Sequence, residues 1–339
     1  MISIRQLHDK HGEVQFDIVL YNKTCIDARC GAWVYKHKMK KLGIDDDKVL
    51  FVPMVDGKYP VDLNIDKKRV LVINGRFNNE DIVHISAVCE CLYIFGRYKS
   101  TKWEMTDFKN VYSIFDMKRS RTQIVWDYFF GQFKSPTPLF SDGSLSGQLF
   151  IGDMFITLDK IHRRPWFIDV LTDYILQKWD HPSSNGLCEY LFFHEIYSDT
   201  TKLDSLLKSS EKEINTMKDK GLIILEVKDK EVSDAVNDSV LMDFKTPSGK
   251  NYKVHFFNCK ISLISDVGNK LALKDNCDFA AKTIHYLKED VWSIYCIGKD
   301  KVNLSELCKE FGGECHTNTI RFTVKNEKGV LQRMFVNHK

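Results

Sequence analysis

Residues 16–33 read Phe16-Asp-Ile-Val-Leu-Tyr-Asn-Lys-Thr-Cys-Ile-Asp-Ala-Arg-Cys-Gly-Ala-Trp33, and this stretch decides the fold class. Its first six residues form a short apolar run, which is typical of a strand buried in a parallel sheet. From Gly31 to Lys41 the sequence favours a helix with a basic end. A buried strand followed closely by a helix predicts the first unit of an alternating α/β domain.

The same alternation continues along the chain. Further strands are predicted at Val49–Pro53, Arg69–Ile73 and Cys91–Phe95. Further helices are predicted at Asn78–Val88, Met117–Phe130 and Pro165–Trp179. Strands that alternate with helices predict an α/β fold, with a parallel sheet that carries helices on both faces.

The second half of the chain has a different pattern. Lys202–Asp234 is charge-rich and is predicted to be mostly helical, with an apolar interruption at Leu222–Val227. A hairpin is predicted from Val240–Thr246 and Tyr252–Phe257. Strands at Val291–Ile297 and Ile320–Val324, with a helix at Leu304–Phe311, complete a smaller α/β lobe. We therefore expect a first domain over residues 1–200, a helical connector over 201–236 and a second domain over 237–339.

The composition limits the classes of protein. The chain has 339 residues, enough for two domains, and its net charge of +3 does not imply a general polyanion-binding surface. No apolar run approaches the roughly 18 residues of a membrane helix, and the start of the chain lacks the apolar core of a signal peptide. We expect a cytoplasmic protein without membrane contact, whose 10 cysteines are reduced.

Five segments, in order, resemble motifs of the DHH phosphoesterase superfamily. The oligoribonuclease-like branch, with a DHHA1-type C-terminal domain, is the most similar. The segments are Ile18–Trp33, Phe115–Phe130, Arg164–Asp173, Leu263–Asn269 and Phe311–Phe322. The resemblance implies a parallel-sheet catalytic domain, a smaller substrate-binding domain and a cleft between them. It also implies hydrolysis of short oligonucleotides or dinucleotides, usually with manganese.

Most of the metal ligands that the resemblance implies are replaced. The replacements are Asn22 for the first-motif His, Asn74 for the second-motif Asp, and Gly96, Arg97 and Tyr98 for the Asp-His-His triplet. Only Asp27 and Asp173 remain as acidic positions. Two carboxylates do not ordinarily hold a pair of divalent ions beside several guanidinium groups. We therefore expect no cofactor and no metal, and the loss of the family's catalysis.

Basic residues accumulate where the metal ligands are missing. Arg29, Arg76, Arg97 and Arg121 fall within or beside motifs that line the family's active site, and Lys99 keeps the family's lysine position. Arginine forks bind phosphate bidentately and keep their charge. One hypothesis is therefore a metal-free phosphate clamp. The alternative is that these arginines fill the vacated cavity and pair with carboxylates such as Asp27, Asp116, Asp127 and Asp173.

The segment Gly312-Gly-Glu-Cys-His316 corresponds to the family's glycine-rich run that ends in His. Amides of Gly312 and Gly313 could form an anion nest, and His316 could donate to a phosphate oxygen. A structural turn with a hydrogen-bonded histidine is the other interpretation. Glu314 interrupts the run and disfavours an anion.

Three functions remain open from the sequence. The first is a catalytically degenerate DHH-like protein that binds a nucleotide or short oligonucleotide phosphate in the interdomain cleft. The second is a still-active metal-dependent phosphodiesterase with rearranged ligands. The third is a structural or interaction protein with a filled cleft, whose protein partner the sequence does not identify.

Overall fold

The computed structural model describes residues 14–75, 77–97, 108–131, 149–151, 154–156, 164–178, 183–298, 302–316 and 319–337. The chain divides into two compact units, Met1–Ile224 and Leu225–Lys339. Within the described residues, none of the helices combines the length and the apolar character that crossing a bilayer requires.

The first unit is built on a five-stranded sheet of order β2-β1-β3-β4-β5, and all neighbouring strands are parallel. Its strands are β1 (Ile18–Asn22), β2 (Leu50–Met54), β3 (Arg69–Ile73), β4 (Cys91–Gly96) and β5 (Val111–Phe115). The central strands β3 and β4 are buried along almost their entire length. The predicted α/β class with a parallel sheet is confirmed.

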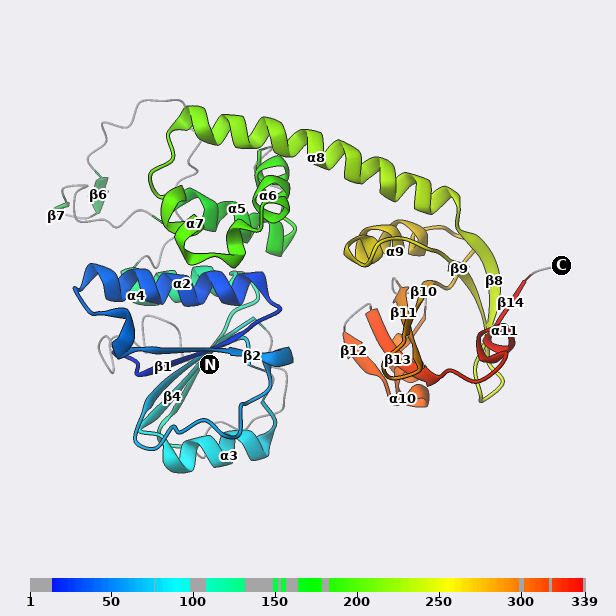
Figure 1. Ribbon diagram of the computed structural model, residues 1–339, viewed down its shortest axis with the longest axis horizontal. Coiled ribbons are helices and arrows are strands. Elements are labelled where there is room, and N and C mark those ends of the chain that lie inside the picture. The colour runs from blue at the N-terminus through cyan, green and yellow to red at the C-terminus, as the bar shows by residue number, and fades with distance from the viewer. Residues whose placement is uncertain are drawn as a thin grey trace. The chain divides into compact units, whose positions relative to one another are not determined.

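Helices cover both faces of this sheet, as predicted. The sheet is flanked by α2 (Ile26–Lys41) and α4 (Arg121–Phe130) on one face and by α3 (Asn79–Val88) on the other (Figure 1). A further layer beyond α2 and α4 consists of α5 (Trp166–Leu176), α6 (Ser184–Phe193) and α7 (Thr200–Leu206). The short strands β6 (Leu149–Ile151) and β7 (Met154–Ile156) pair with each other. Separate apolar cores fill the two sides of the sheet.

Local sequence signals fix the ends of these helices. In α3, Asn78 and Asp81 form a reciprocal capping box. The Ser120 side chain accepts a hydrogen bond from the Gln123 amide and caps α4. The helix therefore begins at Arg121, four residues after the predicted start at Met117. Gly131, in the left-handed conformation with φ 69°, ends α4.

The long helix α8 (Glu211–Asn237) passes from the first unit into the second. The interruption predicted at Leu222–Val227 is wrong, because α8 is continuous through these residues. The apolar run indicated a break, but a short apolar run alone does not distinguish a strand from a buried part of a helix. In the first unit α8 packs on α6 through two glycines, Gly186 and Gly221.

The second unit contains a seven-stranded sheet of order β12-β13-β11-β10-β9-β8-β14. Its strands are β8 (Val240–Lys245), β9 (Asn251–Phe256), β10 (Phe279–Tyr286), β11 (Val291–Gly298), β12 (Glu314–His316), β13 (Thr319–Lys325) and β14 (Phe335–Asn337). Strands β8 and β9 are antiparallel, so the predicted hairpin is confirmed. Helices α9 (Ile264–Ala272) and α10 (Leu304–Phe311) pack on opposite faces of the sheet, and the short α11 (Val330–Met334) precedes β14.

Candidate functional site

The candidate site lies at the carboxyl ends of the strands of the first unit. Strand β1 leads into α2 on one face of the sheet, whereas β3 leads into α3 on the other face. Such a reversal between adjacent parallel strands is where open α/β sheets bind their ligands. Asn22 ends β1, and Asn74 follows β3 with φ 61°, a left-handed conformation that asparagine tolerates better than most side chains.

Asp27, on the first turn of α2, is completely buried and has four hydrogen-bond donors. Its Oδ1 accepts from the Thr122 amide at 2.9 Å and from the Thr122 hydroxyl at 2.8 Å. Its Oδ2 accepts from the Arg121 amide at 2.8 Å and from Arg121 Nη1 at 3.4 Å. The carboxylate therefore holds the first two amides of α4 and places a negative charge at the positive end of that helix.

This arrangement decides whether Asp27 fits a metal. Each carboxylate oxygen accepts one amide of α4. Arg121 Nη1 and the Thr122 hydroxyl, which also lies 2.7 Å from the Asp27 carbonyl, cover the remaining acceptor positions. Among the described residues, moreover, no group of three or more His, Cys, Asp or Glu side chains is arranged to hold an ion. Asp27 as it stands therefore does not fit the manganese ligand that the family resemblance implies.

Two of the predicted arginines lie at the amino ends of α2 and α4. Arg121 begins α4, and its side chain, 12% exposed, contacts Asp27. Arg29 lies two residues beyond Asp27 and is half-buried. The Nε atoms of both arginines are buried and have no hydrogen-bond partner in the described chain. Arg29 therefore retains unused hydrogen-bonding capacity at the switch point, whereas Arg121 is partly committed to Asp27.

Arg97 contacts helix α5, and Asp173 is a residue of that helix. Arg97 follows β4, and its Nη1 donates to the carbonyl of Ile175 at 3.2 Å. Asp173 is a buried residue of the same helix, two positions before Ile175. The retained acidic position Asp173 is thus on a different helix from Asp27. Arg97 is engaged with the end of α5 through at least one terminal nitrogen.

For three predicted site residues the structure describes no side chain. Arg76 and Lys99 lie outside the described residues. Of His316 the structure describes only the backbone, which belongs to β12.

The two glycines of the C-terminal run have structural contacts of their own. Gly312, with φ 62°, ends α10, and its amide donates to the Lys309 carbonyl. The Gly313 amide donates to the Cys308 carbonyl at 2.9 Å. A Cβ at Gly313 would lie 2.5 Å from the Arg321 carbonyl oxygen on β13. Helix termination and close packing therefore explain both glycines without an anion.

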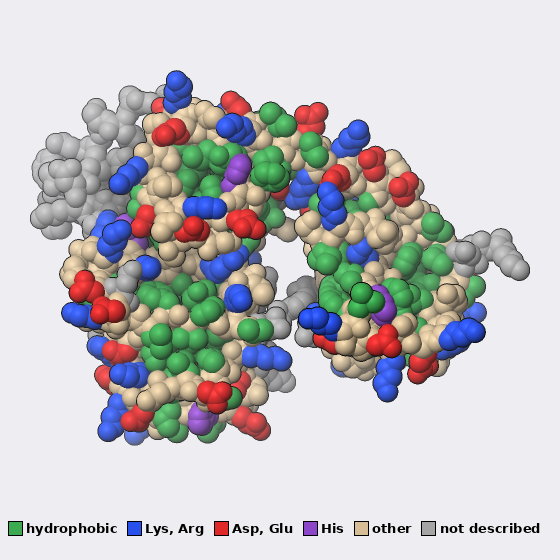
Figure 2. Space-filling model, viewed as in Figure 1, with side chains coloured by type: hydrophobic (Ala, Val, Ile, Leu, Met, Phe, Trp, Pro, Cys, Tyr) green, Lys and Arg blue, Asp and Glu red, His purple; other side chains and the backbone are tan. Residues whose placement is uncertain are grey.

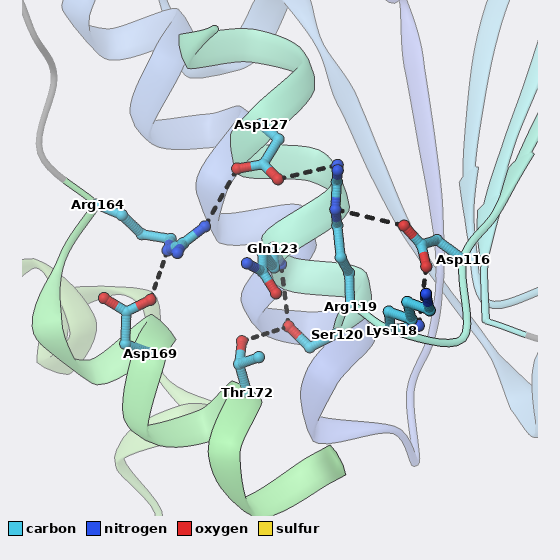
Figure 3. Close-up of polar contacts among 9 residues, drawn as sticks. All are labelled: Asp116, Lys118, Arg119, Ser120, Gln123, Asp127, Arg164, Asp169 and Thr172. Carbon is cyan, nitrogen blue, oxygen red and sulfur yellow. Dashed lines mark hydrogen bonds and ion pairs between the residues drawn. The ribbon is translucent and has the colours of Figure 1, made fainter. Parts of the chain in front are cut away.

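A chain of ion pairs lies between α4 and α5 (Figure 3). Asp127, 3% exposed, contacts Arg119 Nη1 at 3.1 Å and Arg164 Nη1 at 3.2 Å. Arg119 also pairs with Asp116, and Arg164 with Asp169. Next to this chain the hydroxyl groups of Ser120 and Thr172 are 2.7 Å apart. These contacts join the loop after β5 to both helices.

Within the described residues, the network contains three carboxylates and two guanidinium groups. Burial of Asp127 raises the pKa of its carboxyl to about 7, although Arg164 and Arg119 act in the opposite direction. The carboxylates of Asp169 and Asp116 add to the increase. Asp127 is the most buried of the three carboxylates, so the charged form costs most there.

This pKa predicts a pH dependence of stability. A folded-state pKa of about 7 exceeds the unfolded value near 3.9, so the folded state holds the proton more tightly. The unfolding free energy of the first unit should therefore fall as the pH rises from about 4 to 7, by up to about 1.4 kcal/mol per unit. The midpoints of urea unfolding at pH 5 and pH 7.5 measure this fall in the unfolding free energy. Asp127→Asn should remove this contribution. Asp116→Asn should only reduce it, because the Asp116 carboxylate is the smallest of the named causes. Equal pH profiles for wild type and Asp127→Asn would contradict the assignment.

Sequence reasoning missed Arg119 and Arg164 as site residues, although Asp116 and Asp127 were expected to join an ionic network. Both arginines lie within the quoted motifs, but no periodic signal marks them. Thr122 was missed as well, although it supplies two of the donors to Asp27. A polar residue in the first turn of a helix near a buried acidic position is the signal that was available.

Charged side chains of both signs mix on the face of the molecule that Figure 2 shows, where Lys and Arg side chains are interspersed with Asp and Glu side chains. This mixture agrees with the net charge of +3. Any affinity for an anion must therefore come from particular residues rather than from the overall field.

No known family model matches this chain. Over 134 residues the chain is 24% identical to an uncharacterized protein of Acanthamoeba polyphaga mimivirus; the match covers 37% of this chain and about a third (31%) of that protein. A solved structure of PggH, a pGpG-specific phosphodiesterase of Vibrio cholerae, is similar with a TM-score of 0.43 and 10% identity, over 94% of this chain and 96% of that chain. At these values the activity of PggH does not transfer to this chain.

Proposed function

We propose that the first unit binds the phosphate of a nucleotide or short oligonucleotide at the carboxyl edge of its parallel sheet, without a metal and without hydrolysing the ligand. The observation that carries this proposal is Arg29. Its Nε is buried without a hydrogen-bond partner in the described chain, and it lies on the helix that follows β1. An arginine with unused donors at a switch point suits a phosphate oxygen.

The amino end of α2 supports the same proposal. In the described chain, no side chain caps the first turn of α2 with a hydrogen bond, whereas Asp27 occupies the first amides of α4. The positive end of the helix dipole favours an anion here, although the Cys25 thiol already interacts with the amides of Asp27 and Ala28. Burial raises the pKa of the Cys25 thiol at this position, so the sulfur stays neutral and does not repel an anion.

The competing function is an interaction protein with a filled site. The ion pair between Arg121 and Asp27 favours it, because one predicted arginine already has a carboxylate partner. The two functions differ in whether Arg29 is available to a ligand. A third possibility, metal-dependent hydrolysis, needs a ligand set that does not include Asp27.

Thermal unfolding with AMP, a dinucleotide and a short oligonucleotide, all in EDTA, tests the proposal. Ligand at about 100 times its Kd should stabilise the protein by about 2.7 kcal/mol. For a unit of this size that corresponds to a Tm increase of roughly 5–10 °C. Arg29→Met should abolish the increase. Lys40→Met removes the same charge from the other end of α2, where Lys40 is 70% exposed, and should preserve it.

Two results would contradict the proposal. If no ligand of the panel raises the Tm, the interaction protein is favoured. If manganese produces cleavage of the oligonucleotide that EDTA abolishes, the protein is a phosphodiesterase with rearranged ligands.

A further inference from the structure

A cavity of about 460 Å³ lies in the first unit at the amino ends of the parallel strands. This edge of the sheet is opposite the one that carries the candidate phosphate site. The lining includes Arg69, which begins β3, Glu90, which precedes β4, and Cys91, Tyr93 and Tyr112 on β4 and β5. Sites for small molecules typically have volumes of about 300–1,000 Å³, so the cavity has room for one small ligand.

The positive charge of Arg69 at this cavity is already compensated by Asp17. The Arg69 amide and Nε donate to Asp17 Oδ2 at 2.8 and 3.1 Å, and Nη2 donates to Oδ1 at 3.0 Å. These side-chain hydrogen bonds are the main cause of the raised pKa of Arg69. Against the effect of burial, the bonds from Arg69 and the charge of Lys68 lower the pKa of Asp17. The pair is therefore stable as two ions that neutralise each other.

Glu90, by contrast, has a carboxylate that forms no ion pair within the described residues. Its charge adds to the raised pKa of Arg69, but less than Asp17 does. The other polar groups of the lining are neutral, because burial raises the pKa of Cys91 to about 12 and also raises the pKa of Tyr93 and of Tyr112. Glu90 thus gives the lining an uncompensated negative charge.

Aromatic rings stand beside this carboxylate. Tyr93 and Tyr112 lie opposite each other in the register of β4 and β5, with ring centres 4.8 Å apart and planes at 45°. The Tyr112 hydroxyl donates to the Lys109 carbonyl at 3.2 Å, which fixes the ring while it remains only half-buried. The face of such a ring attracts a cation. A carboxylate next to aromatic rings therefore favours a cation that has an apolar body.

From this lining we infer that the cavity binds a small organic amine. The ammonium group pairs with the Glu90 carboxylate, and an aromatic or apolar body lies against Tyr93 and Tyr112. The neutral thiol of Cys91 adds to the apolar part of the wall. An anion is disfavoured, because Arg69 already serves Asp17 and Glu90 repels negative charge. This site is separate from the proposed phosphate site and does not depend on it.

Calorimetric titration of the full-length protein with tyramine tests the inference. Glu90→Gln should weaken binding by about tenfold or more, because the ligand loses a charge-assisted hydrogen bond. Glu80→Gln is the matched control: it removes the same charge from an exposed position in the first turn of α3, and it should leave binding unchanged. Arg29→Met should also bind tyramine like wild type. Absence of binding to the wild type, or equal binding by Glu90→Gln, would overturn the inference.

Two further measurements examine the aromatic wall and the sign of the ligand's charge. Tyr112→Leu keeps an apolar side chain but loses the ring face, and it should weaken binding several-fold. Tyrosine, which adds a carboxylate to the same amine, should bind more weakly than tyramine, because Glu90 repels that carboxylate. Tighter binding of tyrosine would show that Arg69 receives a carboxylate, and it would overturn the assignment to an amine.

Loss of folding does not explain the expected effect of Glu90→Gln. Glu90 is exposed and has no ion pair to lose within the described chain, so the Tm of this variant without ligand should equal that of wild type. A lower Tm for Glu90→Gln would show that this carboxylate stabilises the fold instead of facing a ligand, and it would overturn the inference.

Discussion

An Asp27→Ala variant should lose on the order of 3–5 kcal/mol of the unfolding free energy of the first unit, which removing one member of a buried ion pair typically costs. The substitution leaves the amides of Arg121 and Thr122 without their acceptor. It also removes the carboxylate that faces the Arg121 guanidinium and the Thr122 hydroxyl. Urea unfolding followed by circular dichroism measures the loss.

Two variants show whether the cost comes from burial. Asp199 also accepts amides of a first helical turn, as the N-cap of α7, but it is only partly buried. Asp199→Ala should therefore cost far less, because water replaces the lost acceptor. Asp27→Asn should be nearly as harmful as Asp27→Ala, because its amide nitrogen would face donors. If both Asp27 variants unfold like wild type, Asp27 is available to a ligand after all.

This prediction distinguishes two possible roles of Asp27. By its place in the motif, Asp27 is a surviving metal ligand. By its contacts, it is the acceptor that fixes the start of α4. In the second case, the loss of its carboxylate affects folding first and ligand binding only through the displaced Arg121.

Most strands and helices follow from local patterns. Strand β3 (Arg69–Ile73) and helix α10 (Leu304–Phe311) have the predicted bounds, because apolar runs and helical spacing mark them clearly. Strand β5 (Val111–Phe115) was not predicted, since Ser113 interrupts its short apolar run. Tertiary contact with β4 determines this strand, and a single sequence does not reveal such pairing.

The site was less predictable than the fold. The donors to Asp27 come from Thr122, 95 residues further along the chain, and only the packing of α2 on α4 brings them together. Likewise, Arg164 reaches Asp127 across 37 residues.

Replacing Gly221 with alanine should destabilise the first unit by roughly 3 kcal/mol, as overpacking in a tight interface does. A Cβ at this position would lie 1.7 Å from the carbonyl oxygen of Gly186 and 3.1 Å from the Cβ of Tyr190. Two helix backbones cannot yield as a flexible side chain does, so α6 and α8 must separate. Thermal and urea unfolding both report the loss.

The sign of this effect is the critical test, because alanine normally stabilises a helix interior by about 1 kcal/mol relative to glycine. Gly31, within α2, provides the matched comparison. A Cβ there would meet only side-chain methyl groups of Ile73 and Val125, at 3.2–3.4 Å. Gly31→Ala should therefore be close to neutral, since helix propensity offsets slight crowding. A Gly221→Ala protein as stable as Gly31→Ala would mean that α6 and α8 do not cross at Gly186 and Gly221.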